Sequence, residues 1–198
     1  MSSFIKKIRF QHAYKRWLKK GSPPPPSKRI KQYIIEQYQQ QNNCQTFIET
    51  GTFRGDMITA QLDNFERLYS IELSDELYNA AKQAFANQNK VHLLQGDSGI
   101  RLIEVLNDII GVPLFWLDGH YSGGVTALAD KECPVDEELA TIIASSLDQF
   151  VLLIDDARMF VGEQGYSTID EIKSIINKAY PKASFDVKDD IIRIVQLT

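Results

Sequence analysis

The sequence predicts a doubly wound α/β domain, with a mostly parallel seven-stranded sheet that ends in a C-terminal antiparallel hairpin. Two observations carry this prediction. Apolar runs of strand length alternate with helical patterns five times along residues 46–179, and two strand-like segments then flank Asp189 and Asp190. Such alternation is typical of parallel sheets that are covered by helices on both faces and connected by right-handed crossovers. The fold class is therefore α/β.

The expected strands are short apolar runs bounded by turn residues. They span residues 46–49, 67–72, 91–95, 113–118 and 151–155, and the hairpin strands span 183–188 and 191–196. The expected helices within this alternating region span residues 55–62, 74–87, 98–107, 134–147 and 168–179, and another precedes the first strand at 28–41. Ser74, with Glu76 beyond it, is a good helix N-cap, and Pro134 suits a first turn.

Residues 1–27 are expected to form a basic amphipathic arm with a proline-rich linker, ahead of a domain at 28–198. Residues 3–20 predict a helix with an apolar side and a basic side, and residues 21–27 (GSPPPPS) end it as a stiff spacer. Residues 1–31 hold ten Lys or Arg and no acid, whereas the rest has 12 basic and 26 acidic residues.

Three uses of this arm stay open at the sequence level. It could pack on the acidic body or on a second copy in a homo-oligomer. Residues 3–20 could instead make peripheral contact with an anionic membrane. Nucleic-acid binding is the third alternative, but no nucleic-acid partner is expected, because the body is acidic and has no aromatic-basic sheet or zinc module.

Composition and cysteine usage predict a cytoplasmic protein. The chain is 43% apolar and 24% charged, the balance of an ordinary globular protein. No apolar run approaches the ~18 residues of a membrane span, and bases interrupt the apolar residues before Pro23, so no signal peptide is expected. Cys44 and Cys133 lack zinc-binding spacing and are read as reduced thiols. The expected location is the cytoplasm, with the inner face of the membrane as an alternative.

Acidic residues follow the predicted parallel strands, where ligands of such sheets bind. The first strand runs into a loop in which Gly51 allows a tight turn and Gly55 opens a helix. A plain strand-to-helix turn would explain this loop alone. Glu72, however, ends the second strand 21 residues after Gly51, close to the ~20 at which an acid meets ribose hydroxyls in nucleoside-binding folds. Because the loop is neither GxGxxG nor a phosphate loop, the pattern predicts a nucleoside ligand without pyrophosphate.

These positions resemble the class I S-adenosylmethionine-dependent methyltransferases, whose fold is Rossmann-like. The resemblance covers about residues 40–198 and includes the terminal hairpin. It implies S-adenosyl-L-methionine as cofactor, with Glu49 and Gly51 near its amino-acid part, Glu72 on the ribose, and Asp97 with Ser98 beside the adenine. The full set of implied cofactor-binding residues is Glu49, Thr50, Gly51, Thr52, Phe53, Gly55, Glu72, Gly96, Asp97, Ser98 and Asp118.

A narrower resemblance involves residues 115–124 (FWLDGHYSGG) and 153–158 (LIDDAR). Both segments are similar to small bacterial methyltransferases of glycan and antibiotic pathways, and most of all to the macrocin-type sugar O-methyltransferases. In that group an acid after the fourth strand and an acidic pair after the fifth hold magnesium, and Asp118, Asp155 and Asp156 match these positions. The resemblance implies methylation of a sugar hydroxyl on a glycan or a glycosylated metabolite.

The chemistry of that reaction independently favours a metal. A sugar hydroxyl is almost fully protonated at neutral pH, and a divalent ion bound to it lowers its pKa. Ligand sets made only of oxygen favour Mg²⁺ over zinc. Three neighbouring carboxylates also repel one another unless a cation lies between them or one keeps its proton. The alternative for Asp155 and Asp156 is a solvated turn with helix-capping acids.

The remaining predictions concern the acceptor side. His120, two residues beyond Asp118, is the candidate general base beside the catalytic Asp118, although metal ligation or substrate binding would also fit. Tyr121 is expected to bind substrate, at the start of a segment that is either a lid or a surface loop. Arg158 could orient an anionic substrate group or pair with a nearby acid. Two other functions stay open: methylation of a non-sugar small molecule, and nucleoside binding without catalysis.

Overall fold

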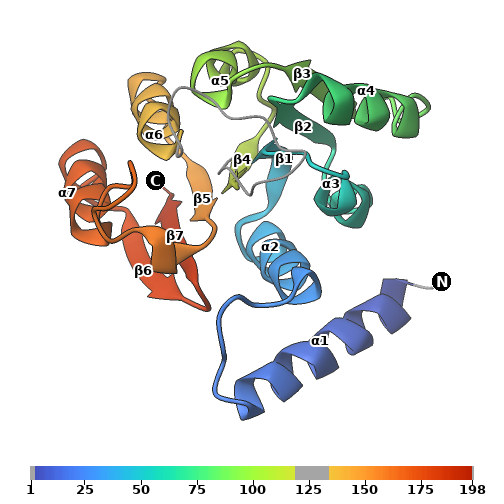
Figure 1. Cartoon of the computed structure of the whole chain (residues 1–198), viewed down its shortest axis with the longest axis horizontal. Helices are drawn as coiled ribbons and strands as arrows, with labels where there is room; N and C mark the ends of the chain where they lie inside the picture. Colours follow the sequence, from blue (N-terminus) through green and yellow to red (C-terminus); the bar gives the residue numbers. More distant parts are fainter. Residues whose placement is uncertain (1–2, 119–133, 198) are drawn as a thin grey trace.

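The computed structural model describes the backbone of residues 3–118 and 134–197, and the side chains of residues 11–118 and 134–197. Its sheet has seven strands in the order β3-β2-β1-β4-β5-β7-β6 (Figure 1). The first five strands of the chain are parallel, and β7 is antiparallel to both of its neighbours. The strands are β1 (Cys44–Thr50), β2 (Arg67–Glu72), β3 (Val91–Gln95), β4 (Val112–Leu117), β5 (Phe150–Ile154), β6 (Ser184–Lys188) and β7 (Ile191–Gln196).

The α/β prediction is thus confirmed, with its parallel sheet and its C-terminal hairpin. The helices are α1 (Ser3–Lys19), α2 (Lys28–Asn42), α3 (Asp56–Gln61), α4 (Asp75–Ala84), α5 (Ser98–Leu106), α6 (Val135–Ala144) and α7 (Ile169–Ala179), with a short 3₁₀ turn η1 (Ala157–Met159). Some predicted boundaries were wrong. β1 starts at Cys44 rather than at residue 46, α4 ends at Ala84, and α6 ends at Ala144, because Ser146 takes a left-handed backbone conformation. The turn η1 was not predicted.

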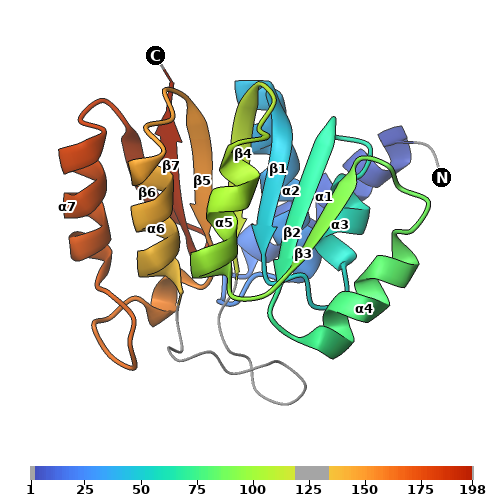
Figure 2. The same ribbon diagram turned by 90° about the horizontal axis from the view of Figure 1, so that it is seen from above.

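Helices cover both faces of the sheet (Figure 2). The apolar sides of α5, α6 and α7 form one buried cluster with one face of the strands, and those of α1 to α4 form a second cluster with the other face. Consecutive strand residues serve opposite clusters: Phe47 belongs to the second and Ile48 to the first, and both are fully buried. This double burial explains why the central strands read as continuous apolar runs.

The C-terminal half of the arm helix α1 packs on the body. Trp17 is buried in the cluster with α2, and its indole Nε1 donates to the Pro23 carbonyl at 3.0 Å. The Tyr14 ring contacts that of Tyr33, and its hydroxyl donates to Asp189 Oδ2 at 2.9 Å. Packing on the body, one of the three alternatives for the arm, therefore applies to these side chains. None of the helices in the described part combines the length and the apolar composition needed to cross a membrane.

Gly55 is required by the packing of the loop between β1 and α3. It has a left-handed φ of 71°, and a Cβ atom there would lie 2.6 Å from Cε2 of the buried Phe85. Replacing Gly55 by Ala is expected to cost about 2–3 kcal/mol of unfolding free energy, from backbone strain and the displaced ring together. Urea denaturation measures this loss.

Gly165 provides the matched control for Gly55→Ala. Its φ is 81°, but no atom lies within 4 Å of a Cβ added there. Gly165→Ala should therefore carry only the backbone strain, about 1 kcal/mol. Equal losses for the two variants would contradict the claim that Phe85 closes the space beside Gly55.

Candidate functional site

Glu72 holds the loop after β1 and the start of α4 in place. Its Oε2 accepts from the Phe53 backbone N–H at 2.8 Å, and its Oε1 accepts from that of Ser74 at 2.9 Å. Phe53 has a φ of 48°, which is unusual for a residue other than glycine. The hydrogen bond from its N–H to Glu72 therefore helps to maintain a strained turn. Each carboxylate oxygen keeps a second lone pair for another donor. The carboxylate predicted to bind ribose thus also shapes the loop.

A buried chain of hydrogen bonds links β1 to β2 beneath this loop. The Ser70 hydroxyl donates to Glu49 Oε2 at 2.8 Å and lies 2.6 Å from the Thr52 hydroxyl. Burial raises the pKa of Glu49 well above its usual range, and the charges of Asp118 and Glu72 act in the same direction. The predicted residues Glu49 and Thr52 are therefore joined to one another through Ser70, which the sequence reasoning missed.

The segment after β3 adjoins the same strand end. The Gly96 N–H donates to the Glu72 carbonyl at 2.9 Å. Asp97 is the N-cap of α5, where its side chain accepts from the Gly99 N–H at 2.8 Å, and Ser98 is buried in the first turn. The capping bond accounts for one oxygen of Asp97, and the segment adjoins the end of β2 through the bond from Gly96 to Glu72.

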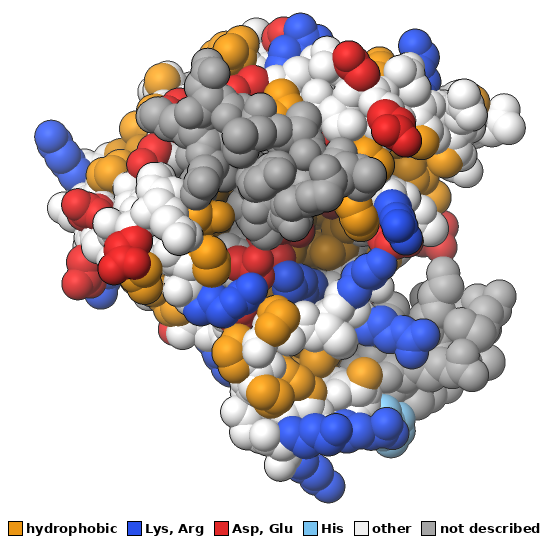
Figure 3. Space-filling model, viewed as in Figure 1, with side chains coloured by type: hydrophobic (Ala, Val, Ile, Leu, Met, Phe, Trp, Pro, Cys, Tyr) orange, Lys and Arg blue, Asp and Glu red, His pale blue; other side chains and the backbone are white. Residues whose placement is uncertain are grey.

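A pocket of about 250 Å³ opens between this loop and the N-terminal segment. The sheet side contributes Glu49, Asp118 and the loop from Gly51 to Arg54, whereas the N-terminal side contributes Pro25, Pro26, Lys28 and Lys31. Figure 3 shows a row of Lys and Arg side chains across the middle of this face, next to a group of acidic side chains. The predicted linker and the start of α2 thus form one wall of the pocket.

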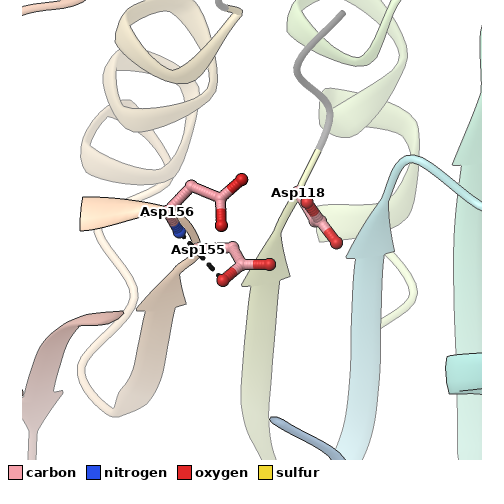
Figure 4. A group of neighbouring side chains, drawn as sticks. All are labelled: Asp118, Asp155 and Asp156. Carbon is pink, nitrogen blue, oxygen red and sulfur yellow. Dashed lines mark hydrogen bonds between the residues drawn. The ribbon is translucent and has the colours of Figure 1, made fainter. Parts of the chain in front are cut away.

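The three carboxylates predicted to hold a metal lie together at the ends of β4 and β5 (Figure 4). Asp118, Asp155 and Asp156 each place a carboxylate oxygen within 4.8 Å of the others. Asp118 is fixed by its backbone N–H, which donates to the Thr50 hydroxyl at 3.3 Å, and Asp156 by its N–H to Asp155 Oδ1 at 2.8 Å. We call these three residues the acid triad. Their oxygen-only donor set fits a hard divalent ion such as Mg²⁺.

Lys31 of α2 reaches this acid triad, and the sequence reasoning missed it. Its ammonium forms a short ion pair with Asp155 and lies 3.3 Å from Asp156 Oδ1. Burial alone would lower the pKa of Lys31, but the charges of Asp155 and Asp118 outweigh it and raise that pKa. Burial and the Asp118 charge in turn raise the pKa of Asp155, against the effect of Lys31. The sequence groups Lys31 with the bases of the N-terminal arm. In the structure it is instead a partly buried cation that contacts the acid triad.

Arg158 contacts the acid triad at Asp156. Its guanidinium donates to Asp156 Oδ1 at 2.9 Å and also pairs with Asp190 in the turn between β6 and β7. Of the two roles left open for Arg158, the structure therefore has the ion pair with neighbouring acids. His120 and Tyr121, predicted as general base and substrate contact, lie outside the described residues, as does the candidate lid.

Glu138 of α6, beside the predicted residues Thr50 and Ser98, is a third residue absent from the sequence-based prediction of the site. It is fully buried beside the hydroxyls of Thr50 and Ser98, and neither of its oxygens has a hydrogen-bond partner of normal geometry among the described residues. Burial raises its pKa to about 7, and the charges of Asp97 and Glu137 contribute. The signal was present, because Glu138 falls on the apolar stripe of α6, three residues after Val135.

Glu138 should make the stability of the protein depend on pH. Since an unfolded Glu titrates near pH ~4.3, the folded state binds more protons than the unfolded state between pH ~4.5 and 7, and stability falls as the pH rises through this window. Glu138→Gln, which stays neutral, is expected to be more stable than wild type by about 2 kcal/mol at pH 8 and to lose this advantage towards pH 4.

Urea denaturation across that pH range measures the effect of Glu138→Gln, with Glu163→Gln on the exposed surface as the control. The control should follow the wild-type pH profile. If Glu138→Gln also follows it, Glu138 does not carry a raised pKa.

Comparisons with known proteins rest on the fold. No protein-family model matches the sequence, and no curated protein sequence matches it significantly. Among solved structures, the chain is similar to the Bacillus cereus O-methyltransferase in complex with S-adenosylhomocysteine, with a TM-score of 0.59 and 14% identity over 96% of this chain and 90% of that one.

Two further solved structures show the same likeness. TomG, an O-methyltransferase from Streptomyces achromogenes in complex with S-adenosylmethionine, has a TM-score of 0.56 and 13% identity over 98% of this chain and 89% of that one. The N-methyltransferase NodS from Bradyrhizobium japonicum has a TM-score of 0.56 and 9% identity over 88% and 99%. The chain therefore has the Rossmann-like α/β fold that these methyltransferases share.

Proposed function

We propose that the protein is an S-adenosylmethionine-dependent O-methyltransferase, assisted by a divalent metal ion, that acts on a sugar hydroxyl. The observation that carries the proposal is the placement of Glu72, Glu49 and the acid triad at neighbouring strand ends, where Glu49 and Asp118 line one pocket. Solved proteins of the same fold include O-methyltransferases crystallised with S-adenosylhomocysteine or S-adenosylmethionine. Because the N-methyltransferase NodS also has this fold, the choice of oxygen as acceptor rests on the acid triad.

The residues at the ends of β1 and β2 suit the cofactor in two respects. Glu72 keeps a free lone pair on each oxygen, which can accept from the two vicinal hydroxyls of a ribose. The backbone around Gly51 has no side chain at the turn, so that a ligand can approach closely. S-adenosylmethionine, when bound, supplies an electrophilic methyl group on a good leaving group. The task of the protein is then to orient an acceptor hydroxyl and to ease the loss of its proton.

The acid triad suits this second task. Asp118, Asp155 and Asp156 would hold Mg²⁺, which lowers the pKa of a hydroxyl bound to it. Asp118 also borders the pocket that Glu49 and Gly51 line, so an acceptor held at the acid triad would lie next to the cofactor. His120 is the proposed general base in the segment that follows Asp118.

Methyl transfer from radiolabelled S-adenosylmethionine to a pool of bacterial saccharides tests the proposal. Label should appear in an alkali-stable sugar ether, and EDTA should abolish the transfer until Mg²⁺ is restored. Transfer that EDTA leaves unchanged would contradict the metal mechanism. Label found on amines or on non-sugar alcohols would contradict the sugar acceptor while leaving the methyltransferase proposal intact.

A further inference from the structure

A lysine of the protein, Lys31, already lies against the acid triad. The Lys31 ammonium contacts Asp155 and lies within ion-pair distance of Asp156, and the Asp118 charge acts on it as well. The Lys31 side chain is 16% exposed and that of Asp155 is fully buried, so bulk water screens this pair only weakly. Three clustered carboxylates can therefore lie together in the folded protein without a bound metal.

A lysine ammonium and a divalent ion that contact the same carboxylate oxygens repel each other, because both are positively charged. Mg²⁺ and Mn²⁺ bind carboxylates through the oxygen lone pairs, and Asp155 Oδ2 and Asp156 Oδ1 are the atoms that face Lys31. The other oxygen of Asp155 accepts the backbone N–H of Asp156, and Arg158 shares Asp156 Oδ1. A divalent ion held by the acid triad would thus repel the ammonium from Asp155.

We infer that Lys31 competes with the metal: its ammonium offsets part of the negative charge of the acid triad in the metal-free protein and moves away when a divalent ion binds. The inference rests on the metal site of the proposed function. It has two consequences. The wild-type protein binds divalent ions weakly, and removal of the ammonium strengthens that binding, because two positive charges no longer compete for the same oxygens.

Binding of Mn²⁺ alone to the full-length protein tests the inference, since it needs neither cofactor nor acceptor. Free Mn²⁺ is measured from its electron paramagnetic resonance signal in a titration of each variant. Lys31→Gln is expected to bind Mn²⁺ on the order of 10- to 100-fold more tightly than wild type. Arg29→Gln is the matched control on the same helix, because it also removes one positive charge but from an exposed position that does not line the pocket, and it should stay near the wild-type affinity.

One further variant and a second measurement keep the test decisive. Adding Asp156→Asn to Lys31→Gln should remove the gain, which would place the Mn²⁺ at the acid triad. If Lys31→Gln is less stable because its carboxylates have lost their cation, Mn²⁺ should raise its melting temperature far more than that of wild type.

Equal Mn²⁺ affinity of wild type and Lys31→Gln would overturn the inference, as would the absence of Mn²⁺ binding to either protein. Neither result would bear on the binding of S-adenosylmethionine, because the titration contains no cofactor. Failure of the inference can therefore be told apart from failure of the methyltransferase proposal.

Discussion

Replacement of Glu72 by Gln is expected to weaken binding of S-adenosylhomocysteine about 30- to 150-fold. The Glu72 carboxylate accepts two backbone N–H groups and, in the proposed complex, the ribose hydroxyls as well. The Gln amide keeps one acceptor oxygen but turns an NH₂ group towards a backbone donor. Hydrogen bonds to a charged group are worth about 1.5–3 kcal/mol each, and a loss of 2–3 kcal/mol corresponds to the stated factor.

Isothermal titration calorimetry measures this affinity, and Glu76→Gln on the exposed first turn of α4 serves as its control. The control should bind like wild type. Because Glu72 also holds the strained Phe53 turn, a urea unfolding curve of each variant is needed to show that the protein is folded at the titration temperature. A folded Glu72→Gln variant with wild-type affinity would remove the ribose role of Glu72.

The second large effect is expected for Asp156→Asn. This change should lower the rate of methyl transfer about 100-fold, while the affinity for S-adenosylhomocysteine changes less than about threefold. In the proposed mechanism the change removes a charged ligand of the metal that would stabilise the transition state, which at about 3 kcal/mol gives this factor. Asn has nearly the same shape as Asp, and Asp156 does not line the pocket with Glu49 and Gly51, so cofactor binding should persist.

Asp186→Asn on the exposed edge strand β6 is the control for Asp156→Asn. Both rates are measured with labelled S-adenosylmethionine at saturating Mg²⁺. An Asp156→Asn variant with the wild-type rate would contradict the role of the acid triad in the reaction. A variant that lost rate and cofactor affinity together would indicate a structural effect instead.

The fold was predictable because the apolar pattern of this chain is unambiguous. Central strands that are buried on both faces, as Phe47 and Ile48 show, produce continuous apolar runs. The helix starts carried local signals too, and Ser74 caps α4 as predicted. The helix ends were harder to predict, because the left-handed Ser146 that ends α6 has no distinctive residue type.

The site was predictable only where it follows directly from strand ends. Asp118, Asp155 and Asp156 are brought together by the parallel order of β4 and β5, which the alternation of elements implies. Lys31 contacts Asp155 across 124 positions of sequence, and nothing in its local pattern distinguishes it from exposed bases such as Lys15 and Lys19. The requirement for a cation among three carboxylates was visible in the sequence, but not which residue would supply it.

The most direct test of the central claim is calorimetric titration of the wild-type protein with S-adenosylhomocysteine. The proposed function predicts one binding site per chain, with a dissociation constant below about 100 µM. Folded protein that does not bind S-adenosylhomocysteine at millimolar concentration would contradict the account. The loop after β1 that Glu72 holds would then not be a cofactor site, and the methyltransferase function would be wrong.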